Sequence, residues 1–421
     1  MSGSRAEAAL GASSRHDVAL VFAARSVRLF GYGLLAVVLV LYLDAIGLSG
    51  GEIGLLLALT LLGDAAISLW LTTHADRVGR RRVLVAGSVL VLAAGLAFLA
   101  TPVFAVLLVA ATIGVLSPSG NEVGPFLAVE QASLSQLIDP ARRTSVFARY
   151  QLAGSVATAL GSLSAGALVQ VAMNQGASGA DAYRLAIVGY ALIGVVLALL
   201  FSRLSPAVEV PAELAATDTV RSRLGLHRSQ AVVLRLSMLF ALDAFAGGFV
   251  IQSFIAFWFA ERWGVDPTVL GWILFFANLL AAASALAAGP LSARIGLIRT
   301  MVFTHLPSNV LLMLVPLMPT LPLAAFVLLA RFSISQMDVP TRQSYTIAIV
   351  DPDERSAAAG VTGIARSLGV AFSPLIAAPL LISSAFAGLP FVIGGGLKIV
   401  YDLLLYRRFQ ALRPPEEREA A

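Results

Sequence analysis

Charged residues in the middle of long apolar segments are the positions at which this sequence could do chemistry. A charge inside a bilayer is costly, so it normally lines a cavity or pairs with another charge. A buried carboxyl group can also take up and release a proton, because desolvation disfavours its charged form. Five residues count to the middle of apolar segments and are the predicted coupling and substrate residues: Glu122, Asp338, Asp64, Asp243 and Arg366.

Glu122 lies in an irregular stretch, residues 118–125, which holds two prolines and two glycines. Such a composition should break or kink a helix. Backbone groups freed by a break inside a membrane need protein or water partners, so this stretch should face a cavity. Counting back from Asp139 places Glu122 near the bilayer midplane. Glu122 is therefore the first candidate for proton or cation handling.

Asp338 precedes Pro340, which is predicted to bend the helix, and lies one helical turn before Arg342. Aspartate and arginine at positions i and i+4 can form an ion pair. A structural pair is one interpretation, and competition by a substrate or a proton for one partner is the other. Lys398 and Asp402 have the same spacing, and for them a structural pair is predicted.

The composition of the chain predicts a membrane protein. Hydrophobic residues make up 58% of the 421 residues and charged residues 13%, whereas a soluble domain carries about 25% charged residues. Many apolar blocks reach the roughly 20 residues that a spanning helix needs. They are apolar on all sides, which argues against the alternating strands of a barrel. The formal charge of +5 is assigned to topology-determining arginines, and no nucleic acid is expected as a partner.

The sequence also argues against a cofactor, a metal ion or an enzymatic activity. The chain has no cysteine, which excludes disulfides and thiolate ligands. Its four histidines are widely separated, and neither a nucleophile elbow nor a nucleotide-binding loop is found. A membrane-embedded enzyme and a channel are the remote alternatives.

The apolar blocks predict an all-α polytopic membrane protein with twelve spans. The longest polar stretch divides them six and six, so two six-helix bundles are predicted, residues 18–203 and 233–406, with a linker at 204–232 and tails at 1–17 and 407–421. The spans cover residues 18–46, 52–74, 82–101, 104–137, 144–171, 182–203, 233–261, 267–291, 299–318, 321–349, 355–383 and 386–406.

The distribution of arginines predicts the orientation of the chain. Almost all loop arginines fall on the side that contains both termini, and the opposite loops hold only Arg184 and Arg262. By the positive-inside rule both termini are cytoplasmic. The first 17 residues lack a cleavable signal sequence, so the first helix is predicted to be an uncleaved signal anchor in the cell (inner) membrane.

An internal repeat relates the two halves in the same orientation, as in a parallel duplication. Residues 130 and 342 are equivalent and opposite in charge, so a salt bridge between the halves is predicted to close the cytoplasmic gate. The landmarks recur 212 residues apart: Glu130, Asp139 and Arg143 in the first half, and Arg342, Asp351 and Arg355 in the second.

The basic turn at residues 75–82 carries a loop motif. The pattern G-x-x-x-D-R-x-G-R-[RK] is matched at Asp76, Arg77, Gly79, Arg80 and Arg81, with Thr72 in place of the first glycine. A weaker copy at residues 293–299 keeps Arg294 and Gly296 but has alanine in place of the acid. With the repeat and the topology, this motif resembles the major facilitator superfamily over nearly the whole chain. The glycine-proline cluster of drug–proton antiporters and the sugar-porter signature are absent.

The resemblance implies the major facilitator fold and a latch on the cytoplasmic side. Gly79 would permit a tight turn, and Asp76 would accept hydrogen bonds from the amides that begin span eleven, near Glu354. That contact would hold the outward-open state. The predicted cytoplasmic gate comprises Asp76, Arg77, Gly79, Arg80, Glu130, Arg342, Asp139, Arg143, Asp351 and Arg355.

The resemblance further implies a secondary transporter that works by alternating access around a midplane site. The acidic residues at mid-depth favour proton coupling, and efflux of a small organic solute is the favoured direction. Proton-coupled uptake of a metabolite and a uniporter are the alternatives. The expected partners are the lipid bilayer, a small-molecule substrate and protons, and a monomer is expected to suffice.

Overall fold

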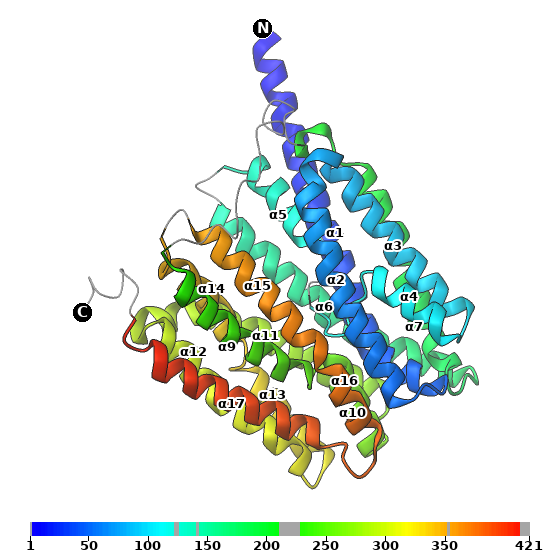
Figure 1. The fold of residues 1–421 in the computed structure, drawn as a ribbon. Coiled ribbons are helices and arrows are strands. Elements are labelled where there is room, and N and C mark those ends of the chain that lie inside the picture. The colour runs from blue at the N-terminus through cyan, green and yellow to red at the C-terminus, as the bar shows by residue number, and fades with distance from the viewer. Residues whose placement is uncertain (1, 122–125, 140–142, 210–227, 352–353, 413–421) are drawn as a thin grey trace. The chain divides into compact units, whose positions relative to one another are not determined.

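The computed structural model describes residues 2–121, 126–139, 143–209, 228–351 and 354–412. Within these residues the regular structure is helical (Figure 1). Ten helical segments are long and apolar enough to cross a membrane, and two shorter apolar helices, Phe104–Ile113 and Leu321–Phe332, lie where predicted spans four and ten begin.

Contacts divide the chain into two units. The first unit comprises Met1–Gly47 and Leu62–Val220, and the second comprises Leu48–Leu61 and Arg221–Ala421. The division falls inside the predicted linker, except that the first part of the second helix groups with the second unit.

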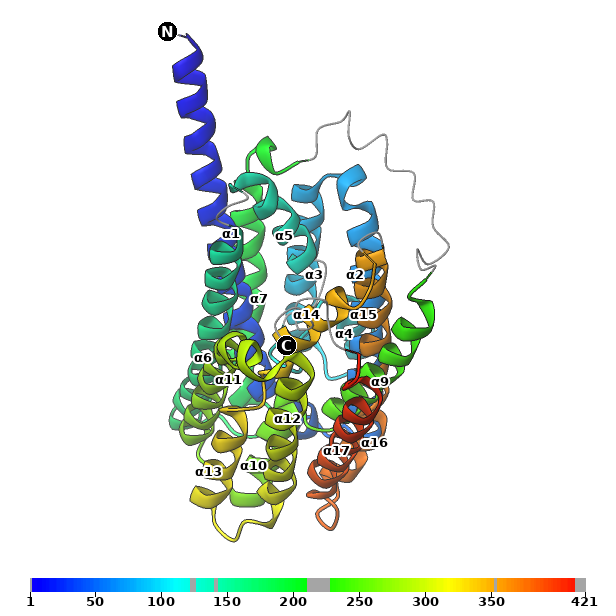
Figure 2. The same ribbon diagram turned by 90° about the vertical axis from the view of Figure 1, so that its left-hand side faces the viewer.

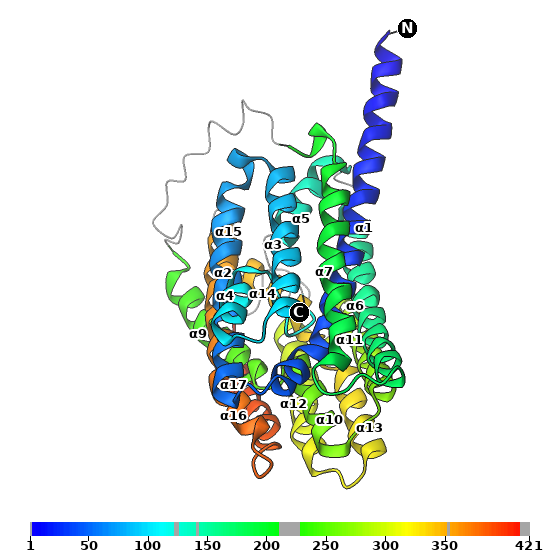
Figure 3. The ribbon, with the colours of Figure 1, turned by 90° about the vertical axis from the view of Figure 1, so that its right-hand side faces the viewer.

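Within the described residues, the first unit contains six complete α-helices, the greater part of α2 and one 3-10 turn. α1 packs along both α6 and α7, and α7 packs along α3 (Figure 3). Small residues permit the close approach of α1 and α6, because a Cβ atom at Gly33 or Gly161 would lie about 2 Å from a backbone oxygen of the other helix. The elements are α1 Ser2–Ala45, α2 Gly50–Val78, α3 Arg80–Ala100, α4 Phe104–Ile113, α5 Phe126–Leu137, α6 Arg143–Asn174, α7 Asp181–Ser202 and η2 Pro206–Val208.

The second unit repeats this pattern with more interruptions. α9 packs along α15 and α17, and α12 packs along α17 (Figure 2). A core of apolar and aromatic side chains joins α9, α12, α14 and α17, with Phe240, Tyr345 and Tyr401 at its centre. The elements are α9 Gln230–Gly248, α10 Gln252–Trp263, α11 Pro267–Ile295, α12 Leu297–Leu314, η3 Val315–Leu317, α13 Leu321–Phe332, α14 Asp338–Ala348, α15 Arg355–Phe372, α16 Pro374–Ile382 and α17 Leu389–Phe409.

Spans four and ten are interrupted in equivalent places. In span four the helix stops at Ile113 and resumes at Phe126, as the prolines and glycines between them predict. In span ten it stops at Phe332 and resumes at Asp338. Span ten was predicted to bend at Pro340, and this position was wrong. Pro340 lies in the first turn of α14, where a proline replaces an amide that has no helical partner, and the break precedes it.

Candidate functional site

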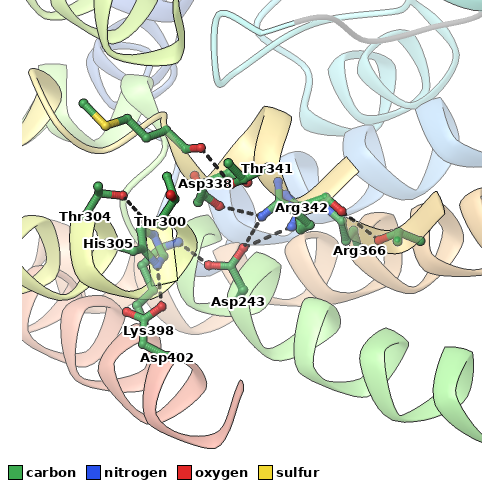
Figure 4. A network of polar contacts seen from close by, with 12 residues as sticks. Asp243, Thr300, Thr304, His305, Asp338, Thr341, Arg342, Arg366, Lys398 and Asp402 are labelled. Atoms are coloured by element: carbon green, nitrogen blue, oxygen red, sulfur yellow. Dashed lines mark hydrogen bonds and ion pairs between the residues drawn. The ribbon is translucent and has the colours of Figure 1, made fainter. Parts of the chain in front are cut away.

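The centre of the candidate site is the carboxylate of Asp243, on α9 of the second unit. Its Oδ1 accepts a hydrogen bond from Lys398 Nζ at 2.6 Å. Its Oδ2 accepts from Arg366 at 3.0 Å and from Arg342 at 3.2 Å. These three cations come from α17, α15 and α14, and Figure 4 shows them converging on Asp243. One carboxylate thus joins four helices.

Arg342 extends the network along α14. Its Nη1 also donates to Asp338 Oδ2 at 2.7 Å, so the predicted i, i+4 pair is present. The guanidinium group lies over the ring of Phe240, 5.6 Å from its centroid. Asp338, Arg342 and Asp243 are all buried. Because Arg342 is shared between two carboxylates, Asp338 is part of the network rather than an isolated pair.

A second branch of the network lies on α12 and α17. Asp402 is fully buried and accepts hydrogen bonds at 2.9 Å from Asn309 Nδ2 and at 2.9 Å from His305 Nδ1. The prediction that Lys398 pairs with Asp402 was wrong, because the lysine reaches across to Asp243 on α9. Asp402 has its own polar partners on α12, whereas Asp243 stands among cations that need a counterion.

Arg331 adds a further cation at the end of α13. Its side chain is buried and stacks over Phe332, with 4.8 Å between the guanidinium carbon and the ring centroid. Its Nε has no hydrogen-bond partner among the described residues, nor does Oγ of Ser335 in the adjacent break. Unpartnered polar atoms inside apolar helices are rare and mark places for water or solute.

Exposure differs sharply within the network. The Arg366 side chain is 34% exposed, whereas the side chains of Asp243, Asp338, Arg342 and Lys398 are at most 10% exposed. Arg366 is therefore the most accessible of these side chains.

The first unit holds a smaller charged cluster between α1, α5 and α6. Arg28 donates two hydrogen bonds to Glu130, at 2.5 and 2.8 Å, and both side chains are fully buried. The hydroxyl of Tyr150 donates to the same carboxylate. Arg25, also buried, donates to Gln151 at 2.8 Å and stacks over Tyr150.

The predicted bridge between Glu130 and Arg342 stays a prediction. Each of these residues has a partner within its own unit: Glu130 pairs with Arg28, and Arg342 pairs with Asp338 and Asp243. A bridge between them would require both to exchange partners.

Gly79 adopts φ of 103°, a conformation that side chains disfavour, and caps the start of α3. Glu209 accepts hydrogen bonds from the backbone amides of Arg80 and Arg81 at 2.6 and 3.1 Å. The Arg80 side chain donates to Gln136 and to the carbonyl of Val208, at 3.0 and 3.2 Å. The basic turn is thus held by residues around η2 of the same unit.

Glu354 plays a corresponding part in the second unit. Its carboxylate accepts from the backbone amides of Arg228 and Ser229 at 2.8 and 2.9 Å, just before α9. Asp351 lies 3.8 Å from the exposed Arg228, which contributes little, and Arg355 is exposed at the start of α15.

The remaining predicted residues belong to other parts of the chain. Asp64 lies half-buried on α2 in the first unit, and Asp139 is exposed after α5. The side chains of Asp76, Arg77 and Arg143, and all of Glu122, lie outside the described residues. The latch at Asp76 and the role of Glu122 therefore stay predictions.

Sequence reasoning missed His305, Lys398 and Asn309 as members of one network. Lys398 carried a signal, because it is the single lysine of the chain beside 28 arginines, 29 basic residues in all. In the described part of the chain no group of three potential metal ligands occurs.

Comparison with known proteins shows the family to which this chain belongs. The family model of the Major Facilitator Superfamily matches residues 21–260 and 236–421. The chain is 30% identical over 417 residues to the uncharacterized membrane protein YJR124C of Saccharomyces cerevisiae, covering 92% of this chain and 93% of that one.

Solved transporters share the fold at low identity. The nucleoside transporter NupG is similar with a TM-score of 0.73 at 11% identity, over 93% of this chain and 98% of that one. The D-xylose–proton symporter is similar with a TM-score of 0.71 at 16% identity, over 92% and 97%. The predicted all-α polytopic fold of two related halves is confirmed.

Proposed function

Because the chain belongs to the Major Facilitator Superfamily, and is therefore a multi-pass membrane transporter and not an enzyme, we propose that it couples solute movement to proton movement through the Asp243 network. The observation that carries this proposal is the contact of one buried carboxylate with three cations from three other helices. The charge state of Asp243 decides whether α9 is tied to α14, α15 and α17.

A proton on Asp243 would remove the negative charge that holds Arg342, Arg366 and Lys398. Uncompensated buried cations are strongly unfavourable, so the arrangement of these helices must differ between the two charge states. A ligand can shift a conformational equilibrium only through such a difference.

The break between α9 and α10 provides a place for this change. α9 ends at Gly248 and α10 begins at Gln252. The break therefore starts less than two helical turns after Asp243. The residues between them are not bound into a helix, so they can absorb a change in backbone angles. The end of α9 that carries Asp243 can then move relative to α10. In this account the charge state of Asp243 drives alternating access, and the change in backbone angles occurs at this break.

The membrane and the orientation belong to the same proposal. The arginine distribution supports a cell (inner) membrane location with both termini cytoplasmic. The chain has no cysteine, so single cysteines can be introduced and labelled with a membrane-impermeant maleimide. Arg203→Cys should be labelled only from the cytoplasmic side, and Gln175→Cys only from the other; both residues are exposed.

The cytoplasmic gate is proposed as predicted, with the ten residues given above. The proposed partners are the bilayer, a small organic solute and protons, with a monomer sufficient. Efflux, the direction favoured by the sequence, and its alternative, uptake, are distinguished by imposing the proton gradient in either orientation.

The test is a proton-flux measurement in proteoliposomes that contain a trapped pH-sensitive dye. Organic cations, anions and neutral metabolites are supplied to wild type, to Asp243→Asn and to Asp44→Asn. Asp44 is a half-buried carboxylate at the end of α1, outside the network, and serves as the matched control. We expect solute-dependent proton movement in wild type and the control and none in Asp243→Asn. Solute flux without proton movement, equal in all three proteins, would refute the proposal.

A further inference from the structure

We infer that the transported solute carries an oxyanion, a carboxylate or a phosphate, and that this group binds Arg366, Lys398 and Arg342 in place of the Asp243 carboxylate. This inference deepens the proposed function and rests on it for the coupling to protons. The chemistry of the binding site itself stands on the charges and contacts of the second unit.

The network holds more positive than negative charge. Its buried or half-buried cations are Arg331, Arg342, Arg366 and Lys398, and its carboxylates are Asp243, Asp338 and Asp402. Four cations against three carboxylates leave one positive charge in excess when His305 is neutral. An anionic group would compensate this excess, whereas an organic cation would increase it.

Glu354 is also buried in this unit, but it does not alter the count at the network. It is bonded to the backbone amide of Ser229 at the start of α9. Asp243 lies 14 residues further along, which corresponds to about 20 Å of helix.

The cations are arranged to receive an oxyanion. Asp243 already presents one carboxylate to them, with Lys398 on Oδ1 and Arg366 and Arg342 on Oδ2. A carboxylate or phosphate of a solute can reproduce these contacts, because arginine binds such groups through paired N–H donors. Arg366 is the accessible member at 34% exposure, and its contact with Asp243 uses only Nη1.

Unpartnered polar atoms support a ligand site near Asp338, with which the charge of Arg331 interacts. Arg331 Nε and Ser335 Oγ, next to the α13–α14 break and three residues or more before Asp338, have no hydrogen-bond partner among the described residues. Both residues are more than nine-tenths buried. Buried polar atoms normally have a partner, so these two mark where the polar remainder of a solute would bind.

Charge balance then links the proton to the anion. When Asp243 is ionised and no solute is bound, its carboxylate compensates the surrounding cations. When a proton sits on Asp243 and an oxyanion is bound, the charge of the solute replaces that of Asp243 and the sum is unchanged. Protonation alone adds to the positive excess, and binding of the anion alone leaves the displaced Asp243 carboxylate buried without its cations, so either event alone is costly. The proton and the anion therefore move together, and an inward proton gradient drives uptake rather than efflux.

The decisive experiment is chemical rescue of Asp243→Asn. This variant leaves the cations without their central carboxylate, so an added small oxyanion should take its place. The midpoint of thermal unfolding is measured for the purified protein with formate, with inorganic phosphate and with formamide, the neutral counterpart of formate, at equal ionic strength. Wild type and Asp44→Asn are the controls.

We expect formate or phosphate to raise the unfolding midpoint of Asp243→Asn clearly more than that of wild type or Asp44→Asn, and formamide to have no such effect. The stronger of the two anions identifies the carboxylate or the phosphate as the preferred group. Equal effects of formate, phosphate and formamide on Asp243→Asn would overturn the inference.

If Asp243→Asn does not fold, the comparison is made between wild type and Arg366→Gln. Formate or phosphate must then stabilise wild type more than formamide does, and this difference must disappear in Arg366→Gln. A difference that persists in Arg366→Gln, or is absent from wild type, would overturn the inference.

A solute series of matched shape separates this inference from the proposed function. Uptake is compared within two series, benzoate, benzamide and benzylamine, and gluconate, glucose and glucosamine. Preference for the cationic or neutral member refutes the anion site and leaves proton coupling intact. Rescue of Asp243→Asn by formate without proton movement in wild type refutes the coupling and leaves the anion site intact.

Discussion

In the first unit the buried cation comes from the first long helix, as Arg28 on α1, and its acid, Glu130, comes from the helix after the break. In the second unit the acid comes from the first long helix, as Asp243 on α9, and the cation, Arg342, comes from the helix after the break. Residues 130 and 342 are 212 positions apart and equivalent in the repeat. In each unit an ion pair thus joins the first long helix to the helix after the break, with the signs of the two charges reversed.

The two clusters also differ in how completely they are closed. The Arg28–Glu130 pair is fully buried, and the hydroxyl of Tyr150 donates a hydrogen bond to the Glu130 carboxylate. Asp243 is shared by three cations, one of which is 34% exposed. A pair that is closed on all sides holds helices together, whereas a carboxylate among several cations, with one side open, can exchange partners. We therefore assign structure to the first cluster and coupling to the second.

The largest expected effect separates the two carboxylates by substitution. Asp243→Asn should lower proton-coupled transport by about 100-fold or more, equivalent to about 2.7 kcal/mol, because the proton acceptor is lost. Glu130→Gln should instead lower the free energy of unfolding by about 3–5 kcal/mol, since it leaves Arg28 buried without its counterion. Proton flux and thermal unfolding are measured on both variants. An unchanged proton-to-solute ratio in Asp243→Asn, or its loss in Glu130→Gln, would reverse the assignment.

Removing both members of a pair sharpens the comparison. Arg28→Met with Glu130→Leu should recover about 1–4 kcal/mol of the stability lost in Glu130→Gln, because apolar side chains replace a buried ion pair well. Asp338→Leu with Arg342→Met should likewise fold but should not transport. Thermal unfolding and solute uptake distinguish the two outcomes. Full transport by the second double variant would show that its charges are structural.

Lys398→Arg tests the single lysine of the chain. The substitution keeps the charge but introduces a larger, planar group that does not give up its proton. We expect transport to fall by about tenfold and the free energy of unfolding to fall by about 1–3 kcal/mol through overpacking near Asp243. Uptake kinetics and thermal unfolding measure the two effects. Wild-type transport in this variant would mean that any cation suffices at position 398.

The smallest expected effect concerns the two carboxylates that cap helix starts. Glu354→Ala should destabilise the protein by about 1–2 kcal/mol and Glu209→Ala by about 0.5–1 kcal/mol, because both lose hydrogen bonds to backbone amides. Glu354 is buried whereas Glu209 is partly exposed, which explains the expected order. Thermal unfolding of the two variants measures the two losses of stability, and a larger loss in Glu209→Ala than in Glu354→Ala would contradict the burial argument.

Much of this architecture follows from the sequence because it is encoded locally. Apolar blocks of span length predict helices, and the prolines around residue 122 predict the interruption of span four. The same reasoning misplaced the break in span ten, because Pro340 is compatible with the first turn of a helix. The break before Asp338 depends on packing that local composition does not encode.

The site itself was only partly predictable. Their position in the middle of apolar segments selected Asp243, Asp338 and Arg366, and helical spacing selected the Asp338–Arg342 pair. The same spacing rule failed for Lys398 and Asp402, because an i, i+4 rule considers one helix at a time. The partners of these two residues lie on α9 and α12, which are remote in sequence.

The most direct test of this account is an infrared difference spectrum of the reconstituted transporter, recorded as the pH is lowered in the presence of inorganic phosphate, an oxyanion that has no carboxyl band of its own. We expect a protonated-carboxyl band to appear in wild type and in Glu130→Gln and to be absent from Asp243→Asn. A band that persists in Asp243→Asn and disappears in Glu130→Gln would place the coupling proton in the first unit and contradict the account.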